Sequence, residues 1–175
     1  MNLRERTLKE LFQTLSGIEK KECEYYPCHF DGQDCSFCFC PFYPCLIYET
    51  GGEFKDDRVW SCVNCHYIHK KEVADEIKLE LLSYPFQILA EEDWFFYNEI
   101  LQNLLFGEVR WKKSGKALTL YDENSEEWYL IKLRGFEIER IERGKREELS
   151  QYEGILIPKQ PPSFQRQAPA HPFQR

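Results

Sequence analysis

The sequence predicts an α+β protein in which a loop-rich, metal-stabilised cysteine-rich module is flanked by helices and followed by a small antiparallel β-meander. Three observations lead to this prediction. All eight cysteines lie within residues 23–65 of a 175-residue chain. Apolar residues recur at helical spacing on both sides of that segment, and beyond residue 108 the pattern changes to the alternation typical of half-buried strands.

Three stretches have the spacing of amphipathic helices. Residues 3–15 repeat leucine and phenylalanine at intervals of three and four residues, and residues 71–83 place their aliphatic side chains on one side. A third helix is expected over about 91–105, ending at Gly107. The acidic residues 91–93 are expected in its first turn, where the helix dipole favours negative charge.

Four runs in the C-terminal half are candidates for a meander. They are VRWKK at 109–113, ALTLYD at 117–122, EWYLIKL at 127–133 and FEIERIE at 136–142. Short polar turns separate them, as in antiparallel hairpins. The last run does not settle the period, so a helix stays open as an alternative there.

These patterns divide the chain into four parts. We predict an N-terminal helix at 1–20, a cysteine-rich metal-binding module at 21–83, a domain of helix plus β-meander at 84–157 and a tail at 158–175. The tail is rich in proline and glutamine and almost free of aliphatic residues. That composition is typical of a disordered segment.

Charge and composition restrict the location and the partners. The formal net charge is −7, which argues against a polyanion binder and makes nucleic acid an unexpected partner. The first residues carry spaced charges and no apolar core, so no secretory signal is expected. No run approaches the roughly 20 apolar residues of a membrane span. A cytoplasmic protein is expected, and in that reducing compartment closely spaced cysteines favour metal ligation over disulfides.

The cysteine spacing, C-x4-C-x6-C-x2-C-x-C-x4-C-x16-C-x2-C, is the strongest signal in the sequence. A CxxC turn directs two thiolates to one tetrahedral ion, as in zinc knuckles. We expect two four-thiolate sites, in which both CxxC pairs share one ion and both C-x4-C pairs share the other. The first set is Cys35, Cys38, Cys62 and Cys65, and the second is Cys23, Cys28, Cys40 and Cys45. His29, His66 or His69 can replace one ligand.

Zinc, with about two ions per chain, is the favoured metal. An iron–sulfur cluster is the alternative, although the spacing matches neither the bacterial nor the plant ferredoxin pattern. A thioredoxin-like redox pair would require a βαβ context that these segments lack. The many aromatic residues between the cysteines are expected to wrap the metal sites and to exclude water from them.

The runs YPCHFDGQDCSFCFCPFYPC at 26–45 and WSCVNCHYIH at 60–69, with Gly51-Gly52 between them, resemble the cysteine-rich small domain of archaea and anaerobic bacteria. The similarity covers about residues 22–80. That domain is regarded as a metal-binding module, and it also occurs fused to cobinamide-salvage enzymes such as adenosylcobinamide amidohydrolase and a cobinamide-phosphate phosphatase. The resemblance implies a metal module and a link to corrinoid metabolism. The matching positions are Cys28, His29, Cys35, Cys38, Cys40, Cys45, Cys62, Cys65 and His69.

The letters GGEF at 51–54 match the signature of diguanylate cyclases, but they lie between cysteine pairs with no room for a cyclase domain. We expect the glycines to form a loop that turns back to the second CxxC pair. No P-loop, dinucleotide fingerprint, HExxH or serine-nucleophile motif is present in the sequence.

Three functions remain open. The favoured one is a non-catalytic, metal-stabilised module that mediates protein or ligand interaction. The alternatives are an iron–sulfur redox or electron-transfer protein and an accessory enzyme or carrier in cobinamide salvage. The identity of a protein partner or small-molecule ligand does not follow from the sequence.

Overall fold

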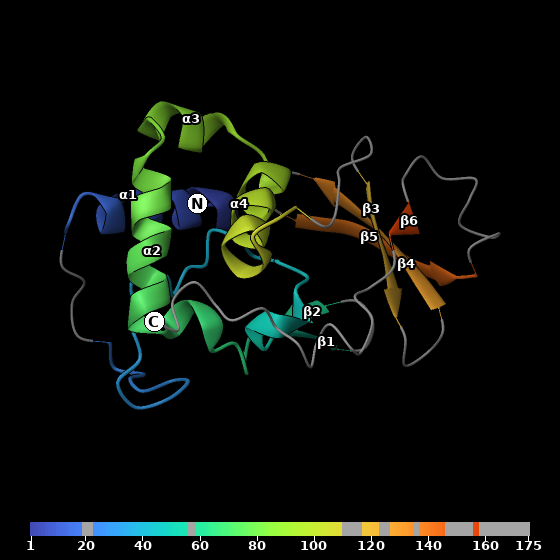
Figure 1. Ribbon diagram of the computed structural model, residues 1–175, viewed down its shortest axis with the longest axis horizontal. Helices are drawn as coiled ribbons and strands as arrows, with labels where there is room; N and C mark the ends of the chain where they lie inside the picture. Colours follow the sequence, from blue (N-terminus) through green and yellow to red (C-terminus); the bar gives the residue numbers. More distant parts are fainter. Residues whose placement is uncertain are drawn as a thin grey trace. The chain divides into compact units, whose positions relative to one another are not determined.

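The computed structural model describes residues 1–18, 23–55, 59–109, 117–122, 127–134, 137–145 and 156–157. The chain divides into two compact units, Met1–Asp93 and Trp94–Arg175, and the cysteine-rich segment lies wholly in the first. Figure 1 shows helices and short strands in both units, which confirms the α+β class. The four-part division expected from the sequence stays a prediction.

The first unit begins with helix α1, Leu3–Leu15, as expected from its leucine spacing. Asn2 caps its start, because the Asn2 side chain accepts from the Glu5 backbone N–H and the Glu5 carboxylate accepts from the Asn2 N–H. This reciprocal capping box satisfies two donors that a helix start otherwise leaves exposed. Leu11 and Leu15 are buried on the inner face of α1.

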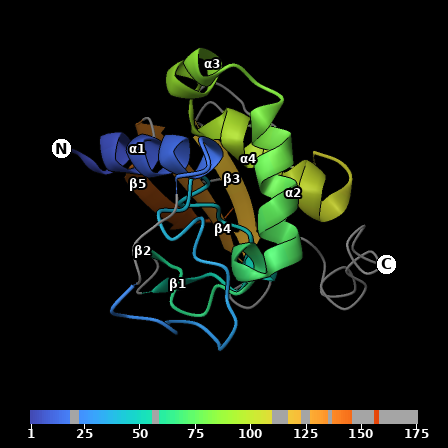
Figure 2. The same cartoon turned by 90° about the vertical axis from the view of Figure 1, so that its left-hand side faces the viewer.

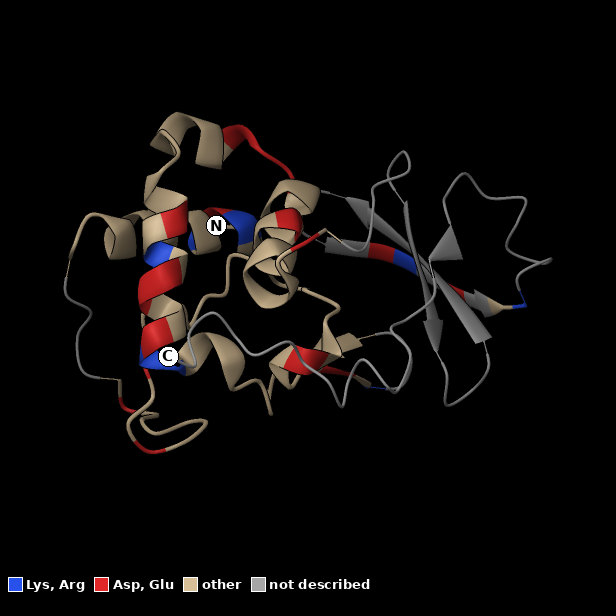
Figure 3. Ribbon diagram, in the orientation of Figure 1, with Lys and Arg blue, Asp and Glu red and all other residues tan. Residues whose placement is uncertain are grey.

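Helix α2, Lys71–Leu82, contacts α1 and runs across it (Figure 2). Its buried face consists of Val73, Ala74, Ile77 and Leu81, which follow the helical period. The opposite face is charged, and Figure 3 shows acidic and basic residues interspersed along it. The predicted helix at 71–83 is therefore confirmed to within one residue at its end.

The cysteine-rich segment between α1 and α2 has little regular structure. It contains two 3-10 turns, η1 (Tyr48–Thr50) and η2 (Tyr67–His69), and one short hairpin of β1 (Glu53–Lys55) and β2 (Val59–Ser61). The interior of this segment is largely aromatic. Phe37, Phe42, Leu46, Ile47 and Trp60 are each 0–1% exposed.

The expected helix over 91–105 is wrong at its start. The structure has two helices, α3 (Phe86–Glu91) and α4 (Trp94–Phe106), so residues 91–93 lie at their junction. The cause is the side chain of Arg4, whose Nη2 donates to the carbonyl oxygens of Ala90 and Glu92 at 2.9 and 2.6 Å. A guanidinium that satisfies the last carbonyls of a helix stabilises its end.

The second unit contains α4 and a four-stranded sheet of order β5-β4-β3-β6. β3 (Ala117–Asp122), β4 (Glu127–Arg134) and β5 (Glu137–Gly144) form the expected antiparallel meander. β6 (Leu156–Ile157) pairs parallel to β3, which the sequence did not indicate.

The run at 136–142, for which a helix was open, forms a strand from Glu137 onward. Most of the first run, 109–113, and the whole tail after 157 lie outside the described residues. Within the described ranges, no helix combines the length and the apolar character needed to cross a membrane.

Candidate metal centre

Two tight turns carry the four cysteines that interact most strongly. In the first, the backbone N–H of Tyr43 donates to the carbonyl of Cys40 at 3.2 Å, and in the second the N–H of Cys65 donates to the carbonyl of Cys62 at 3.0 Å. Cys45 follows the first turn and is buried with Cys65. Only the second turn has a cysteine at each end, and a turn of this kind is the local geometry of a metal knuckle.

Three contacts hold these two turns together. The Thr50 hydroxyl lies 3.5 Å from the Cys45 sulfur, and the Thr50 carbonyl accepts from the His66 backbone N–H at 3.0 Å. The Tyr43 hydroxyl donates to the carbonyl of Trp60 at 3.0 Å. The first turn is thereby tied to β2, and Thr50 joins Cys45 to the residue that follows Cys65.

The electrostatics show that the four thiols form one cluster. Burial, followed by the charges of Cys45, Cys62 and Cys65, raises the pKa of Cys40 well above its ordinary value. Burial raises the pKa of Cys45 to about 11, with Cys65 adding to the rise. It raises the pKa of Cys62 to about 12, with contributions from Cys45 and Cys65. Burial also raises the pKa of Cys65. Without a cation, these thiols are therefore protonated at neutral pH.

Trp60 encloses this cluster on one side. Its indole ring is 1% exposed and meets the rings of Tyr48 and Phe54 edge-on, with ring centroids 5.2 Å away in each case. Its buried N–H makes no hydrogen bond of ordinary geometry to the described residues. That N–H nevertheless lowers the pKa of Cys45 and Cys62, because a donor near a sulfur stabilises the thiolate. Trp60 thus offers a donor to thiolates in an otherwise apolar wall.

The glycine pair at 51 and 52 allows the loop to approach the second turn. Gly51 has φ +92°, and a Cβ there would overlap the Asn64 carbonyl and lie 2.7 Å from Nδ1 of His66. A Cβ on Gly52 would overlap the indole ring of Trp60. The glycine-rich loop therefore packs directly against the Cys62–Cys65 turn, as expected from the sequence.

The pairing of the cysteines differs from the one expected. The structure brings Cys40 and Cys45 together with Cys62 and Cys65, whereas the spacing had suggested Cys35 and Cys38 as the partners of Cys62 and Cys65. None of the eight cysteines, all of which the structure describes, forms a disulfide. In the described part of the chain, no three Cys, His, Asp or Glu side chains stand in an arrangement that could already hold a metal ion. Whether the eight cysteines and the histidines bind metal stays a prediction.

The donor set nevertheless fits a soft divalent cation. Four sulfurs in an apolar enclosure repel one another when ionised, and a divalent cation removes that repulsion while holding the thiolates deprotonated. Four thiolates without carboxylate or water match a closed structural zinc site. Cys40, Cys45, Cys62 and Cys65 would hold such an ion.

A second cluster is centred on Gln33, a buried side chain of the loop before the first CxxC pair. Its Nε2 lies 3.2 Å from the sulfur of Cys28 and 3.3 Å from that of Cys35. Its Oε1 accepts from the backbone N–H groups of His29 and Phe30 at 2.7 and 3.3 Å. Gln33 therefore joins two thiols that lie seven residues apart in the sequence.

Two imidazoles lie beside this loop. The rings of His29 and His69 stack with centroids 4.3 Å apart, and Nδ1 of His69 lies 2.8 Å from the carbonyl oxygen of Asp34. Burial is the main cause that lowers the pKa of His69, with a smaller repulsion from His29, while the Asp34 carbonyl acts in the opposite direction. His69 is therefore neutral at physiological pH.

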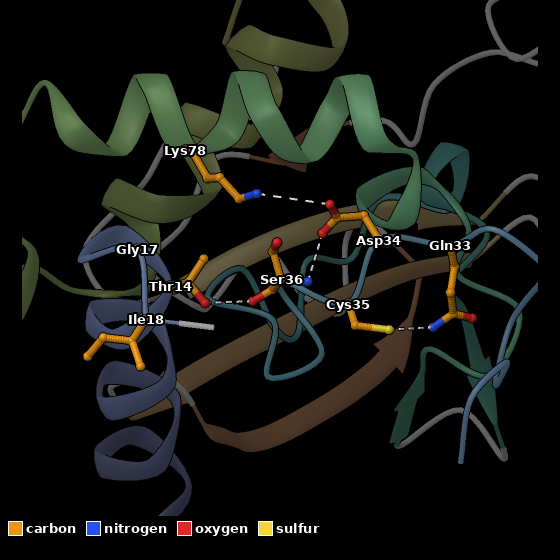
Figure 4. A pocket seen from close by; sticks show the side chains of 8 residues that line it. All are labelled: Thr14, Gly17, Ile18, Gln33, Asp34, Cys35, Ser36 and Lys78. Atoms are coloured by element: carbon orange, nitrogen blue, oxygen red, sulfur yellow. Dashed lines mark hydrogen bonds and ion pairs between the residues drawn. The ribbon is translucent and has the colours of Figure 1, made fainter. Parts of the chain in front are cut away.

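A cavity of about 480 Å³ opens beside this cluster. Figure 4 shows its wall, in which Gln33 reaches toward Cys35 and Lys78 reaches toward Asp34. The Lys78 ammonium lies 3.9 Å from the Asp34 carboxylate. The lining residues are Thr14, Gly17, Ile18, Gln33, Asp34, Cys35, Ser36 and Lys78.

The other two cysteines lie at the surface. Cys38 ends a turn in which its N–H donates to the Cys35 carbonyl at 3.4 Å. Cys23 and Cys38 are exposed, as is Cys28 of the second cluster. The sequence did not indicate Gln33 or Thr50 as parts of these clusters, nor the N–H donor role of Trp60, which belongs to the aromatic residues expected around the cysteines. The available signal was position, since each of them lies within five residues of a cysteine.

We predict that Gly52→Ala will lower the melting temperature, because the new methyl group must displace Trp60 from the thiol cluster. Overpacking of this kind costs about 1–3 kcal/mol. Glu53→Ala, at the exposed neighbouring position, is the matched control and should leave the melting temperature unchanged. In a Trp60→Leu background the effect of Gly52→Ala should largely disappear, and an equal effect in both backgrounds would contradict the assignment.

Comparison with known proteins identifies the family of the cysteine-rich segment. A family model of the cysteine-rich small domain matches residues 14–89. An uncharacterized protein of Methanocaldococcus jannaschii is 44% identical over 86 residues, which cover 47% of this chain and 71% of that protein. A probable cobalt-factor III C(17)-methyltransferase of Methanothermobacter thermautotrophicus is 52% identical over 62 residues, which cover 35% of this chain but only 18% of that protein. No solved structure matches the chain. The chain belongs to the cysteine-rich small domain family.

Proposed function

We propose that this protein binds zinc through Cys40, Cys45, Cys62 and Cys65, and that the metal stabilises a non-catalytic interaction module. The observation that supports the proposal most strongly is the cluster itself. Four thiols from two segments are buried together with aromatic side chains, and burial, with neighbouring thiols adding at Cys40, Cys45 and Cys62, raises their pKa. A bound divalent cation would stabilise the deprotonated sulfurs, because its attraction to each thiolate outweighs the repulsion among the thiolates.

A structural role agrees with the ligand count. Four protein ligands complete the coordination of zinc and leave no position for water or substrate, unlike catalytic zinc sites with three protein ligands. The segment also contains few aliphatic side chains, and small modules of this kind depend on metal for stability. An iron–sulfur cluster would use the same four thiolates, and the colour of the purified protein distinguishes the two metals.

A second proposal concerns the partner. The cobalt-factor methyltransferase relative contains a segment 52% identical to 62 residues of this chain. We infer that the module assists enzymes that act on cobalt-containing corrinoids, as a binding or docking element rather than as the catalyst. The support is limited to that shared segment, since more than four-fifths of the relative lies outside it.

The metal proposal predicts that the purified protein is colourless and contains zinc, and that chelation unfolds the first unit. Cys62→Ser should remove one ion per chain and lower the melting temperature, since 1 kcal/mol corresponds to about 4–8 °C for a domain of this size. Cys23→Ser, at an exposed cysteine outside both clusters, is the matched control. Metal content by mass spectrometry and near-ultraviolet circular dichroism measure both effects. A metal-free protein with a cooperative unfolding transition would contradict the proposal, and visible absorption would favour iron–sulfur.

Metal binding should also release protons. Cys45 and Cys62 have pKa values of about 11 and about 12, so both carry protons at pH 7, and zinc must displace them to bind thiolates. Binding to the four-thiol cluster should therefore release about four protons and weaken as the pH falls. Isothermal titration in buffers of different ionisation enthalpy counts the protons. Release of one proton or none would show that fewer thiols bind.

The corrinoid proposal predicts that the zinc-loaded protein shifts the visible absorption bands of cobinamide. Titration of cobinamide with the protein to high micromolar concentration tests this directly. Serum albumin at equal concentration controls for non-specific adsorption. An unchanged spectrum would contradict direct corrinoid binding without affecting the zinc proposal, because metal content is measured separately.

A further inference from the structure

We propose that Cys28, Cys35 and His69 form a second metal site, with mixed sulfur and nitrogen ligands and a coordination position open to the neighbouring cavity. The site shares no ligand with the four-thiol cluster of Cys40, Cys45, Cys62 and Cys65, so it can be present or absent independently of that cluster. Three observations on separate residues lead to it.

The first observation is that two thiols converge on one donor. Backbone N–H groups can only donate, so the Gln33 oxygen must face those of His29 and Phe30, and the amide nitrogen must face the sulfurs. Its two hydrogens then lie against the sulfurs of Cys28 and Cys35, at N···S distances of 3.2 and 3.3 Å. The partly positive NH2 group of Gln33 therefore contacts both sulfurs, and a bound cation would occupy the same position.

The second observation is the tautomer of His69. The Asp34 carbonyl oxygen can only accept, so Nδ1 of His69 carries the proton and Nε2 keeps its lone pair. Metal-binding imidazoles are typically held in this form, with one ring nitrogen donating to a backbone carbonyl and the other facing the metal. The Asp34 N–H also donates to the His69 carbonyl at 2.7 Å, which ties the histidine to the residue between Gln33 and Cys35.

The third observation is a buried nitrogen beside these groups. Nδ1 of His29 is inaccessible to solvent and has no hydrogen-bond partner among the described residues. The His29 ring stacks on that of His69, and His29 follows Cys28 directly in the sequence. A buried polar atom without a partner is costly in an otherwise satisfied structure, and reorientation around a bound metal would relieve that cost.

The geometry also indicates what the site would do. Because these side chains do not yet stand in a metal-holding arrangement, a metal would draw them together and displace the Gln33 amide from the two sulfurs. Three protein ligands leave one tetrahedral position free, as in zinc sites that bind an exogenous group. Gln33 and Cys35 line the 480 Å³ cavity, so the free position would be accessible from that cavity to a small anion (Figure 4).

Cobalt(II) titration of the full chain tests this proposal, because its visible spectrum reports the ligands. The wild type should bind two equivalents, and azide should change only the absorption bands of the second. Cys28→Ser should weaken the second equivalent by more than the roughly 10–100-fold typical of an outer partner, while it leaves the first unchanged. Cys23→Ser and His66→Asn alter an exposed cysteine and an exposed histidine of the same segment, and both should behave as wild type.

The outcomes separate this proposal from the four-thiol site. A single equivalent that Cys62→Ser abolishes would overturn the second site and leave the first intact. Two equivalents that Cys28→Ser does not affect would also overturn it. If azide leaves the visible absorption bands of the second cobalt(II) equivalent unchanged, the proposal of an open coordination position is overturned. The wild-type azide titration requires no variant, so a folding defect in Cys28→Ser cannot conceal the result.

Discussion

The cysteine-rich segment of the first unit is organised around four buried thiols that lie among aromatic side chains. Burial raises the pKa of all four thiols, and neighbouring thiols add to the rise at Cys40, Cys45 and Cys62. Trp60 and Phe42 are buried in the same segment. This arrangement is unfavourable for thiolates and favourable for a cation bound to them. The loops of the segment bring the turn at Cys40 and the turn at Cys62, which are distant in the sequence, close together in space.

Residues around the four thiols hold the two turns together. Thr50 contacts the sulfur of Cys45 through its hydroxyl and the turn after Cys65 through its carbonyl. Gly51 and Gly52 permit an approach to Asn64 and Trp60 that no side chain would allow. The helices α1 and α2 supply the aliphatic core that the cysteine-rich segment lacks. The module therefore combines an ordinary helical core with a segment whose stability we attribute to metal.

Local patterns predicted the helices and the meander because periodicity reports which face of an element is buried. They failed where a distant residue decides the outcome. Arg4 ends α3 from 86 positions away, and the parallel pairing of β6 with β3 has no local signal. The cysteine spacing predicted eight ligands in two sets, and both the ligation and the sets stay predictions, since spacing alone does not show which turns lie together in space. Only the contacts of Thr50 and Tyr43 show that the C-x4-C turn at Cys40 faces the turn at Cys62.

X-ray absorption at the zinc edge tests the central claim most directly, because it counts the atoms bound to the metal. The sample is the Cys28→Ser variant, in which the second site is weakened, loaded with one equivalent of zinc. A zinc ion bound by Cys40, Cys45, Cys62 and Cys65 should show a single shell of four sulfurs at about 2.3 Å with no nitrogen or oxygen. A shell with two or more nitrogen or oxygen atoms would contradict the assignment of Cys40, Cys45, Cys62 and Cys65 as one metal site.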